Sequence, residues 1–264
     1  MKKKKYKISI LITNYNKEKF LYKSLKSVLS QKYKNYEIIL FDDESTDKSV
    51  NIIKQYKKIK LIRNLKKDKN KTGAENQITG ILQAFKESRG QIICLMDSDD
   101  LFVKNKLNII NNFFQKQKYF NCVFNFPKTQ KKLFKFKNKN HDNSIWPTIF
   151  PTSCISMRRS FFTIFVKHIK KDKFPNLEVD ARLTIFSNFF FNEYNLIHKK
   201  LTLYSFDPKG ITSKINKFSK IWWIRRREAY IYLKYIFDKK NKSFNSGFDY
   251  YLTLFFSTIL KIKT

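Results

Sequence analysis

Short apolar runs alternate with amphipathic segments over roughly the first hundred residues of the chain. The runs are continuous and rich in Ile, Leu and Phe, which is typical of strands buried on both faces of a sheet. The predicted strands span residues 6–13, 36–43, 58–64 and 91–97. The predicted helices between them span residues 17–31, 45–56 and 75–88. This order predicts an α/β fold, with a Rossmann-like, mainly parallel sheet flanked by helices.

Polar residues follow three of the predicted strands, at the point where each strand ends. They are the clusters Thr13–Asn16, Asp42–Ser45 and Asp97–Asp100. In parallel sheets, ligands bind beyond the carboxyl ends of the strands. All three clusters are therefore expected at one edge of the sheet, where they would form a single site.

The acidic cluster "DSDD" (97–100) closes the fourth predicted strand. Asp97 and Asp99 are two positions apart, so in extended backbone both carboxylates can face one ion. Hard divalent cations such as Mg²⁺ and Mn²⁺ prefer carboxylate oxygens and share their ligand shell with phosphates. The spacing predicts a metal site at Asp97 and Asp99, with a solvated acidic turn or a helix cap as the alternative.

Two further side chains at this edge are candidates for ligand contacts. Asp42 can accept a hydrogen bond from a base or a ribose, whereas Asp43 or Ser45 can instead cap the next helix. The ring of Tyr15, just beyond the first strand, can stack on a planar base. The alternative for Tyr15 is packing against the following helix.

The stretch "ISILITNYNKEKFLYKSLKSVLSQKYKNYEIILFDDESTDKS", followed by "RGQIICLMDSDD", resembles the family 2 nucleotide-sugar glycosyltransferases, which have the GT-A fold. The resemblance is close over residues 6–104 and looser to about residue 215. It implies an inverting enzyme that moves a sugar from a nucleotide-diphosphate donor to a hydroxyl acceptor. It also implies Mn²⁺ or Mg²⁺ as cofactor, a carbohydrate or lipid-linked acceptor, and a role in cell-surface polysaccharide or lipopolysaccharide synthesis.

The resemblance assigns roles to particular positions. Family residues matching Thr13, Tyr15 and Asp42 hold the nucleotide, and those matching Asp97 and Asp99 contact ribose, diphosphate and metal. Asp100 is adjacent and belongs to the same substrate-binding set. The chain departs from the family in having Thr13 where Pro is usual, Glu44 where Gly is frequent, and "TGAENQITG" (72–80) without the Arg of the "ARN" segment.

A general base is expected in the second half of the chain, where the family places an acidic residue. Asp180 in "NLEVDARL" is the candidate, with Glu178 second. An acid at a helix N-terminus, or a partner of Arg182, is the alternative reading of Asp180. Residues 1–104 are then the nucleotide-sugar-binding half, residues 105–215 the acceptor-binding half and residues 216–264 a C-terminal helical extension.

Two later regions leave alternatives open. Lys209–Lys214 and Trp222–Glu228 match a loop that closes over the donor in family members, or they form a solvated basic surface. The apolar segment Phe248–Thr264 either lies in a membrane interface beside acidic lipids or packs on the domain or on a second subunit.

The charge is strongly positive, with 55 Lys and Arg against 21 Asp and Glu and a net charge of +34. Such a surface suits an acidic membrane or nucleic acid. A Lys excess accompanied by many Asn, Ile and Phe also fits a genome of biased base composition. Three cysteines without CxxC spacing indicate reduced thiols, so we expect a cytoplasmic protein, peripheral at the inner face of the membrane.

Two functions compete with sugar transfer. A basic nucleic-acid-binding module without catalysis would explain the charge, but acidic clusters at one sheet edge would repel phosphate without a metal, so nucleic acid is not expected as a partner. A nucleotidyltransferase would usually carry a Gly-rich phosphate loop, and "TNYNKEKF" (13–20) contains no Gly.

Overall fold

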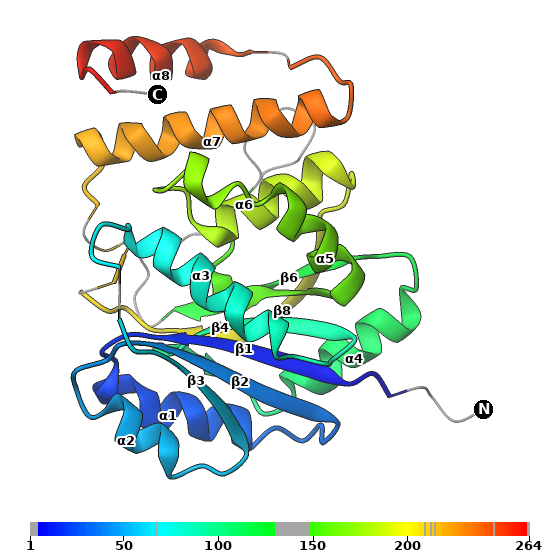
Figure 1. Cartoon of the computed structure of the whole chain (residues 1–264). Helices are drawn as coiled ribbons and strands as arrows, with labels where there is room; N and C mark the ends of the chain where they lie inside the picture. Colours follow the sequence, from blue (N-terminus) through cyan, green and yellow to red (C-terminus); the bar gives the residue numbers. More distant parts are fainter. Residues whose placement is uncertain are drawn as a thin grey trace.

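The computed structural model describes residues 5–66, 68–129, 148–208, 210, 211, 213, 215–244 and 246–262 (Figure 1). The strands are β1 (Ile8–Asn14), β2 (Tyr36–Asp43), β3 (Ile59–Asn64), β4 (Ile92–Asp97), β5 (Leu101–Phe102), β6 (Cys122–Thr129), β7 (Ile155–Arg158) and β8 (Asn195–Tyr204). The α-helices are α1 (Glu18–Leu29), α2 (Ser49–Lys54), α3 (Gly73–Lys86), α4 (Lys106–Lys116), α5 (Arg159–His168), α6 (Val179–Ile185), α7 (Lys220–Lys239) and α8 (Phe248–Ile259). The described residues also form two short 3-10 helices, η2 (Thr152–Cys154) and η3 (Lys171–Lys173), and a π-helix, η4 (Phe186–Phe190).

The described strands form one sheet in the order β3-β2-β1-β4-β7-β6-β8-β5. Strands β1 to β4 are parallel to one another, as the alternating pattern predicts. Strand β7 runs antiparallel to both β4 and β6, and β8 runs parallel to β6. The carboxyl ends of β6 and β8 therefore point the same way as those of β1, β2 and β4.

Helices cover both faces of the sheet (Figure 1). On β1, Ile10 and Ile12 pack into a core with helices α1, α2 and α4, whereas Leu11 packs into a second core with α3, α5 and α6. Successive side chains of a strand point to opposite faces, so a strand covered on both sides must be apolar at every position. The continuous apolar runs in the sequence have this cause.

The predicted fold class, a mainly parallel sheet flanked by helices, is confirmed, and the first strands match their predicted ranges within a few residues. Helix α2 is shorter than predicted because residues 44–47 form a loop. Helix α3 begins earlier than predicted because Thr72 and Glu75 form a capping box, in which each side chain accepts a hydrogen bond from the other residue's backbone N–H.

A tight connection links the middle of the sheet to its edge. Strand β4 ends at Asp97 and β5 begins at Leu101, yet β5 pairs with β8 on the far side of β7 and β6. Residues 98–100 are too few to cross three flat strands, each about 4.8 Å wide. The sheet therefore curls, and its β8–β5 edge returns to the end of β4.

The last two helices form an outer layer. Helix α7 lies over α6, and α8 runs antiparallel to α7 on its outer side (Figure 1). Within the described part of the chain, each helix is too short or too polar to cross a membrane.

Candidate active site

The polar strand ends meet at one edge of the sheet. In the strand register Asn14 lies opposite Asp42 and Thr13 lies opposite Asp97. The pairing thus brings the predicted clusters after β1, β2 and β4 side by side. The curl of the sheet adds the end of β8 to the same edge.

Asp42 is fully buried, and its carboxylate accepts hydrogen bonds from other residues of the chain. Its Oδ1 accepts a hydrogen bond from the Ser45 backbone N–H at 3.0 Å, and its Oδ2 accepts from Ser45 Oγ and Asn14 Nδ2, both at 2.7 Å. Ser45 therefore does not cap α2, and that reading is wrong. The N-cap of α2 is Lys48, and Asp47 before it accepts from the Ser49 N–H at 2.9 Å.

The loop after β1 is tied to the loop after β2. Asn16, which has a left-handed backbone (φ 51°), accepts from the Thr46 N–H at 2.8 Å, and its own N–H donates to Ser45 Oγ at 2.9 Å. Tyr15 precedes this turn and is exposed at the rim of the sheet edge. Asp43, next to Asp42, accepts from Asn64 Nδ2 at 2.8 Å, which links the ends of β2 and β3.

The acidic cluster after β4 is held on several sides. Asp97 accepts from Gln77 Nε2 at 2.7 Å, and its backbone N–H donates to Ser153 Oγ at 2.8 Å. Burial, with the negative charge of Asp99 second, raises the pKa of Asp97 to about 7. Asp100 is fully buried and accepts from the Ser205 N–H at 2.9 Å, and burial and its acidic neighbours raise its pKa as well.

Asp99 pairs with a lysine that the sequence reasoning missed. Lys17, at the start of α1, donates from Nζ to Asp99 and, at 2.5 Å, to Asp207 Oδ2. Burial lowers the pKa of Lys17, but the charges of Asp99 and Asp207 outweigh it, so the pKa is raised overall. One ammonium group thus joins segments that lie far apart in the sequence.

Asp207 was also missed, although a signal existed. Asp207 follows the end of β8, at the same edge where Asp42 and Asp97 lie at the ends of β2 and β4. Ligands bind beyond the carboxyl ends of parallel strands, so Asp207 would have been predicted at the site if the direction of β8 had been known. Gln77 lies in the segment that lacks the family's Arg, so the sequence left its contacts with the donor in doubt; in the structure it donates to Asp97.

Asp180 lies in the first turn of α6 and accepts from the Ala181 N–H at 2.8 Å. Burial raises its pKa to about 6, and its charge contributes to the raised pKa of Asp97. The pKa of the Tyr204 phenol is raised by burial first, and then by four acids. These acids are Asp100, Asp97, Asp99 and Asp180. Asp180 therefore belongs electrostatically to the strand-end cluster.

Two residues next to Asp180 in the sequence, Arg182 and Glu178, have partners other than Asp180. Arg182 does not pair with Asp180; its buried guanidinium donates to the carbonyl oxygens of Leu177, Ile169 and Phe174. Glu178 is buried and forms an ion pair with Arg225. Arg225, expected either at the donor or on a solvated surface, thus contacts α6.

A buried lysine lies behind the acidic cluster. Lys106, at the start of α4, donates to the Ser153 carbonyl oxygen at 2.6 Å and to Thr202 Oγ1 at 2.8 Å. Burial lowers its pKa to about 8, and the charge of Asp100 opposes that shift. Lys106 supplies positive charge from the interior, while Lys17 supplies it from the rim.

The donor set suits a hard divalent cation. Asp97 and Asp99 offer carboxylate oxygens at the end of one strand, and the raised pKa of Asp97 means that added positive charge would favour its ionised form. Within the described ranges, no three His, Cys, Asp or Glu residues already converge as a metal cage.

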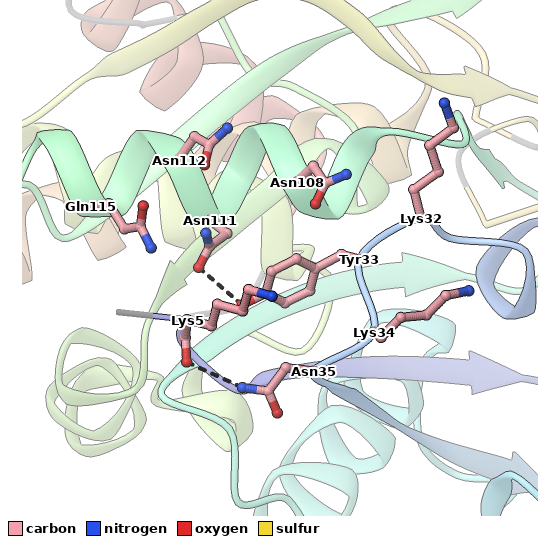
Figure 2. Close-up of a pocket in the computed structure, with 9 residues that line it drawn as sticks. All are labelled: Lys5, Lys32, Tyr33, Lys34, Asn35, Asn108, Asn111, Asn112 and Gln115. Atoms are coloured by element: carbon pink, nitrogen blue, oxygen red, sulfur yellow. Dashed lines mark hydrogen bonds between the residues drawn. The ribbon is translucent and has the colours of Figure 1, made fainter. Parts of the chain in front are cut away.

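Two pockets differ in their relation to this edge. One of about 720 Å³ lies between α6 and α7 and is lined by Glu178, Ala181, Trp222, Arg225 and Arg226 among others. Another, of about 510 Å³, is shown in Figure 2. Lysine and amide side chains that precede β1 and β2 or belong to α4 line it, so it lies at the opposite, amino end of these strands.

The comparisons with known proteins agree on one family. The profile of Glycosyl transferase family 2 matches residues 9–172. A glycosyltransferase of Rickettsia bellii is 33% identical over 157 residues, which are 57% of this chain and 22% of that protein. The Escherichia coli UDP-Glc:alpha-D-GlcNAc-diphosphoundecaprenol beta-1,3-glucosyltransferase WfaP is 36% identical over 121 residues, 45% of each chain. The match thus spans less than half the length of these relatives.

Solved structures share the fold at low identity. Staphylococcus aureus TarS in complex with UDP-GlcNAc superposes with a TM-score of 0.63 at 14% identity, over 97% of this chain and 76% of that one. The mannosyltransferase PcManGT of Pyrobaculum calidifontis, in complex with GDP-Man and Mn²⁺, superposes with a TM-score of 0.57 at 13% identity, over 98% and 71% of the two chains. The predicted GT-A fold is thereby confirmed.

Proposed function

Because the chain belongs to Glycosyl transferase family 2, we propose that it transfers a sugar from a nucleotide-diphosphate donor to an acceptor hydroxyl, with inversion at the anomeric carbon. The observation that carries the proposal is the gathering of Asp97, Asp99, Asp100 and Asp180 around one sheet edge. The pKa values of Asp97, Asp100 and Asp180 are raised by burial, and such buried carboxylates are costly to a fold and typical of a functional site.

The donor would lie across the ends of β1, β2 and β4. Tyr15, exposed at the rim, is suited to stack on the base, and Thr13 and Asp42 lie where the nucleotide would pass. Because the carboxylate of Asp42 is bonded to Ser45 and Asn14, its proposed contribution is to hold the shape of the nucleotide site. Asp97, Asp99 and Asp100 would face the ribose and diphosphate.

Asp97 and Asp99 are the proposed holders of Mn²⁺ or Mg²⁺. The ion, when bound, supplies positive charge that stabilises the departing diphosphate. Lys17 lies against Asp99 and can add a second positive charge on that side.

Asp180 is the proposed general base. With a pKa of about 6 it is ionised at neutral pH, yet it holds a proton more strongly than an ordinary aspartate. The acceptor oxygen would form its bond to the anomeric carbon as the bond to the diphosphate oxygen breaks. The hydroxyl proton passes to Asp180, and attack from the face opposite the leaving group inverts the centre.

The acceptor would enter from the side of the pocket between α6 and α7. This pocket combines apolar residues, such as Leu177, with Arg225 and Arg226, whose acidic partners Glu178 and Asp249 also line it. Apolar walls beside arginines that could exchange these partners for a phosphate suit an acceptor that carries lipid and phosphate, as WfaP's does by its name. We place the reaction in surface polysaccharide or lipopolysaccharide assembly, at the cytoplasmic face of the membrane.

The proposal is tested by transfer from nucleotide sugars in the presence of Mn²⁺. Asp99→Asn is expected to lower kcat by about 10²–10³-fold, because it removes a charge that the reaction needs. Asp68→Asn, a change of an exposed acid in the loop after β3, is the matched control and should retain activity. Equal rates for the wild type and Asp99→Asn would contradict the proposed role of the acidic cluster.

The net charge of +34 favours a second candidate, a basic protein that binds nucleic acid. Such binding would be electrostatic and would weaken steeply with salt. Retention of duplex DNA at physiological salt, together with no response of thermal stability to any nucleotide sugar with or without Mn²⁺, would favour it over transfer.

A further inference from the structure

Helix α8 has its polarity reversed relative to an ordinary surface helix. A helix that covers a globular core normally turns its apolar side inward. In α8 the buried positions are Thr253, at 1% exposure, and Ser257, at 3%. Two aromatic side chains at the flanks of this face, Tyr250 and Phe256, contact α7, and other large apolar side chains of the helix point outward.

The inward face is satisfied by polar contacts. Thr253 Oγ1 donates to the Asp249 carbonyl oxygen at 2.8 Å and accepts from Arg226 Nε at 3.0 Å, and Ser257 Oγ donates to the Thr253 carbonyl oxygen at 2.6 Å. Arg226 also forms an ion pair with Asp249. These contacts fix the rotation of α8 on α7, so the outward face is a defined feature of the fold.

The outward face is a continuous apolar stripe. Its members recur at intervals of three or four residues and therefore lie on one side of the helix. They are Phe248 at 82% exposure, Tyr251 at 59%, Phe255 at 60% and Ile259 at 56%. Four large apolar side chains in one line are more than the scattered single residues that a soluble surface normally shows.

The two helices α7 and α8 and the residues that flank them are rich in exposed lysines. Exposed lysines of the α7–α8 region are Lys217, Lys220, Lys234, Lys239, Lys240, Lys242 and Lys261. Asp249 is engaged by Arg226 and Tyr230, and Asp238 is an exposed acid in the same region. Positive charge around an apolar stripe is complementary to an acidic lipid surface, where the stripe enters the interface and lysines meet headgroups.

We propose that the stripe of Phe248, Tyr251, Phe255 and Ile259 docks α8 in the plane of an anionic lipid bilayer. A 12-residue helix is about 18 Å long and does not span a bilayer, so it lies on the surface. Helix α8 is the outermost layer in Figure 1, so the bilayer would contact the molecule without displacing α7.

Vesicle binding tests the proposal without any substrate, so its outcome is independent of the proposed function. The full chain is sedimented with phosphatidylcholine vesicles that contain about 30% phosphatidylglycerol, a composition that gives a negative surface. Tyr251→Ser combined with Phe255→Ser is expected to weaken binding by about tenfold or more, as is omission of phosphatidylglycerol. The combined variant changes exposed residues only, and circular dichroism should show it folded.

Tyr119→Ser is the matched control. Tyr119 is exposed and follows α4, which packs on the opposite face of the sheet, so vesicle binding should be unchanged. Equal vesicle binding by the wild type and the α8 variant would overturn the proposal. So would a dimer in solution that the α8 variant dissociates, combined with no vesicle binding by the wild type, because the stripe would then contact a second copy.

Discussion

Lys17 places an ammonium group between the carboxylates of Asp99 and Asp207. The three side chains are only slightly exposed, so solvent screens their interaction weakly. Lys17 supplies, in the protein without donor, part of the positive charge that the acidic cluster requires. A divalent ion that binds Asp99 would compete with it.

Lys17→Met should lower the free energy of unfolding of the donor-free protein by about 1–3 kcal/mol, because two carboxylates then lack their partner. Mn²⁺ should also raise Tm more in this variant than in the wild type, since the competing ammonium is gone. Lys19→Met changes an exposed lysine nearby and serves as the control. An identical Mn²⁺ response in all three proteins would show that Lys17 and the ion do not compete.

Asp180 connects rate and stability through its pKa. The value of about 6 lies above the ordinary 3.8, so the carboxyl contributes its full stability below about pH 4 and loses it as the pH rises through about 6. Asp180→Asn should therefore stabilise the donor-free protein at about pH 8 by about 1–3 kcal/mol, and by less at about pH 5. Urea unfolding at the two pH values measures this.

The same variant should lose transfer activity. In the wild type, kcat should fall about tenfold per pH unit below pH 6 as Asp180 takes up its proton. An Asp180→Asn protein that remains active, with the same pH profile as the wild type, would assign the base to another residue.

At the residue scale the sequence predicted that the polar strand ends meet at one edge, but not the contacts among them. Thr13, Asp42 and Asp97 were placed correctly at one edge because strand ends can be read from apolar runs. The bonds of Asp42 to Ser45 and Asn14 were not foreseen, because the length of α2 decides whether Ser45 faces the helix or the strand end. Lys17 gave no signal among the many lysines of the chain.

Arg182 is the central contact of the segment that carries Asp180. Its guanidinium is fully buried and donates to carbonyl oxygens of residues 169, 174 and 177, which form the approach to α6. Burial lowers its pKa to about 10. The guanidinium thus supplies the hydrogen-bond donors that backbone N–H groups would supply to these carbonyl oxygens in a regular helix or strand.

Arg182→Met should lower the free energy of unfolding by about 3–5 kcal/mol, because it leaves several buried carbonyl oxygens without donors. Arg63→Met, at a largely exposed position of β3, is the control and should cost less than about 1 kcal/mol. Denaturation by urea measures both. If Arg182→Met lowered the free energy of unfolding no more than the control does, water would be replacing the guanidinium without loss of stability.

At the element scale, helices that pack on the parallel half of the sheet were predictable, because their apolar stripes face a core. The orientation of helix α8 was not predictable, because the sequence pattern of an apolar stripe is the same whether the stripe faces a core or solvent. The sequence left open whether this segment packs on the domain or meets a membrane. Its buried Thr253 and Ser257 pack toward α7 together with Tyr250 and Phe256, and the stripe that includes Phe255 faces outward.

At the scale of the whole molecule, the two halves of the sheet differ in how well sequence reveals them. The β1–β4 half is built from regular β-α units, so chain order predicts spatial order. In the other half, β7 is antiparallel and β5 pairs with β8 across about a hundred residues. Pairing of such distant segments depends on tertiary contacts that local patterns do not encode.

The connection from β4 to β5 has a consequence for engineering and for natural variation. Its three residues must span from a strand in the middle of the sheet to one at its margin, and two of them, Asp99 and Asp100, belong to the proposed donor site. A substitution of Asp99 would alter the proposed catalysis and leave the strand pairing in place. An inserted or deleted residue would instead misalign β5 with β8, so the length of this turn is expected to tolerate change far less than its composition.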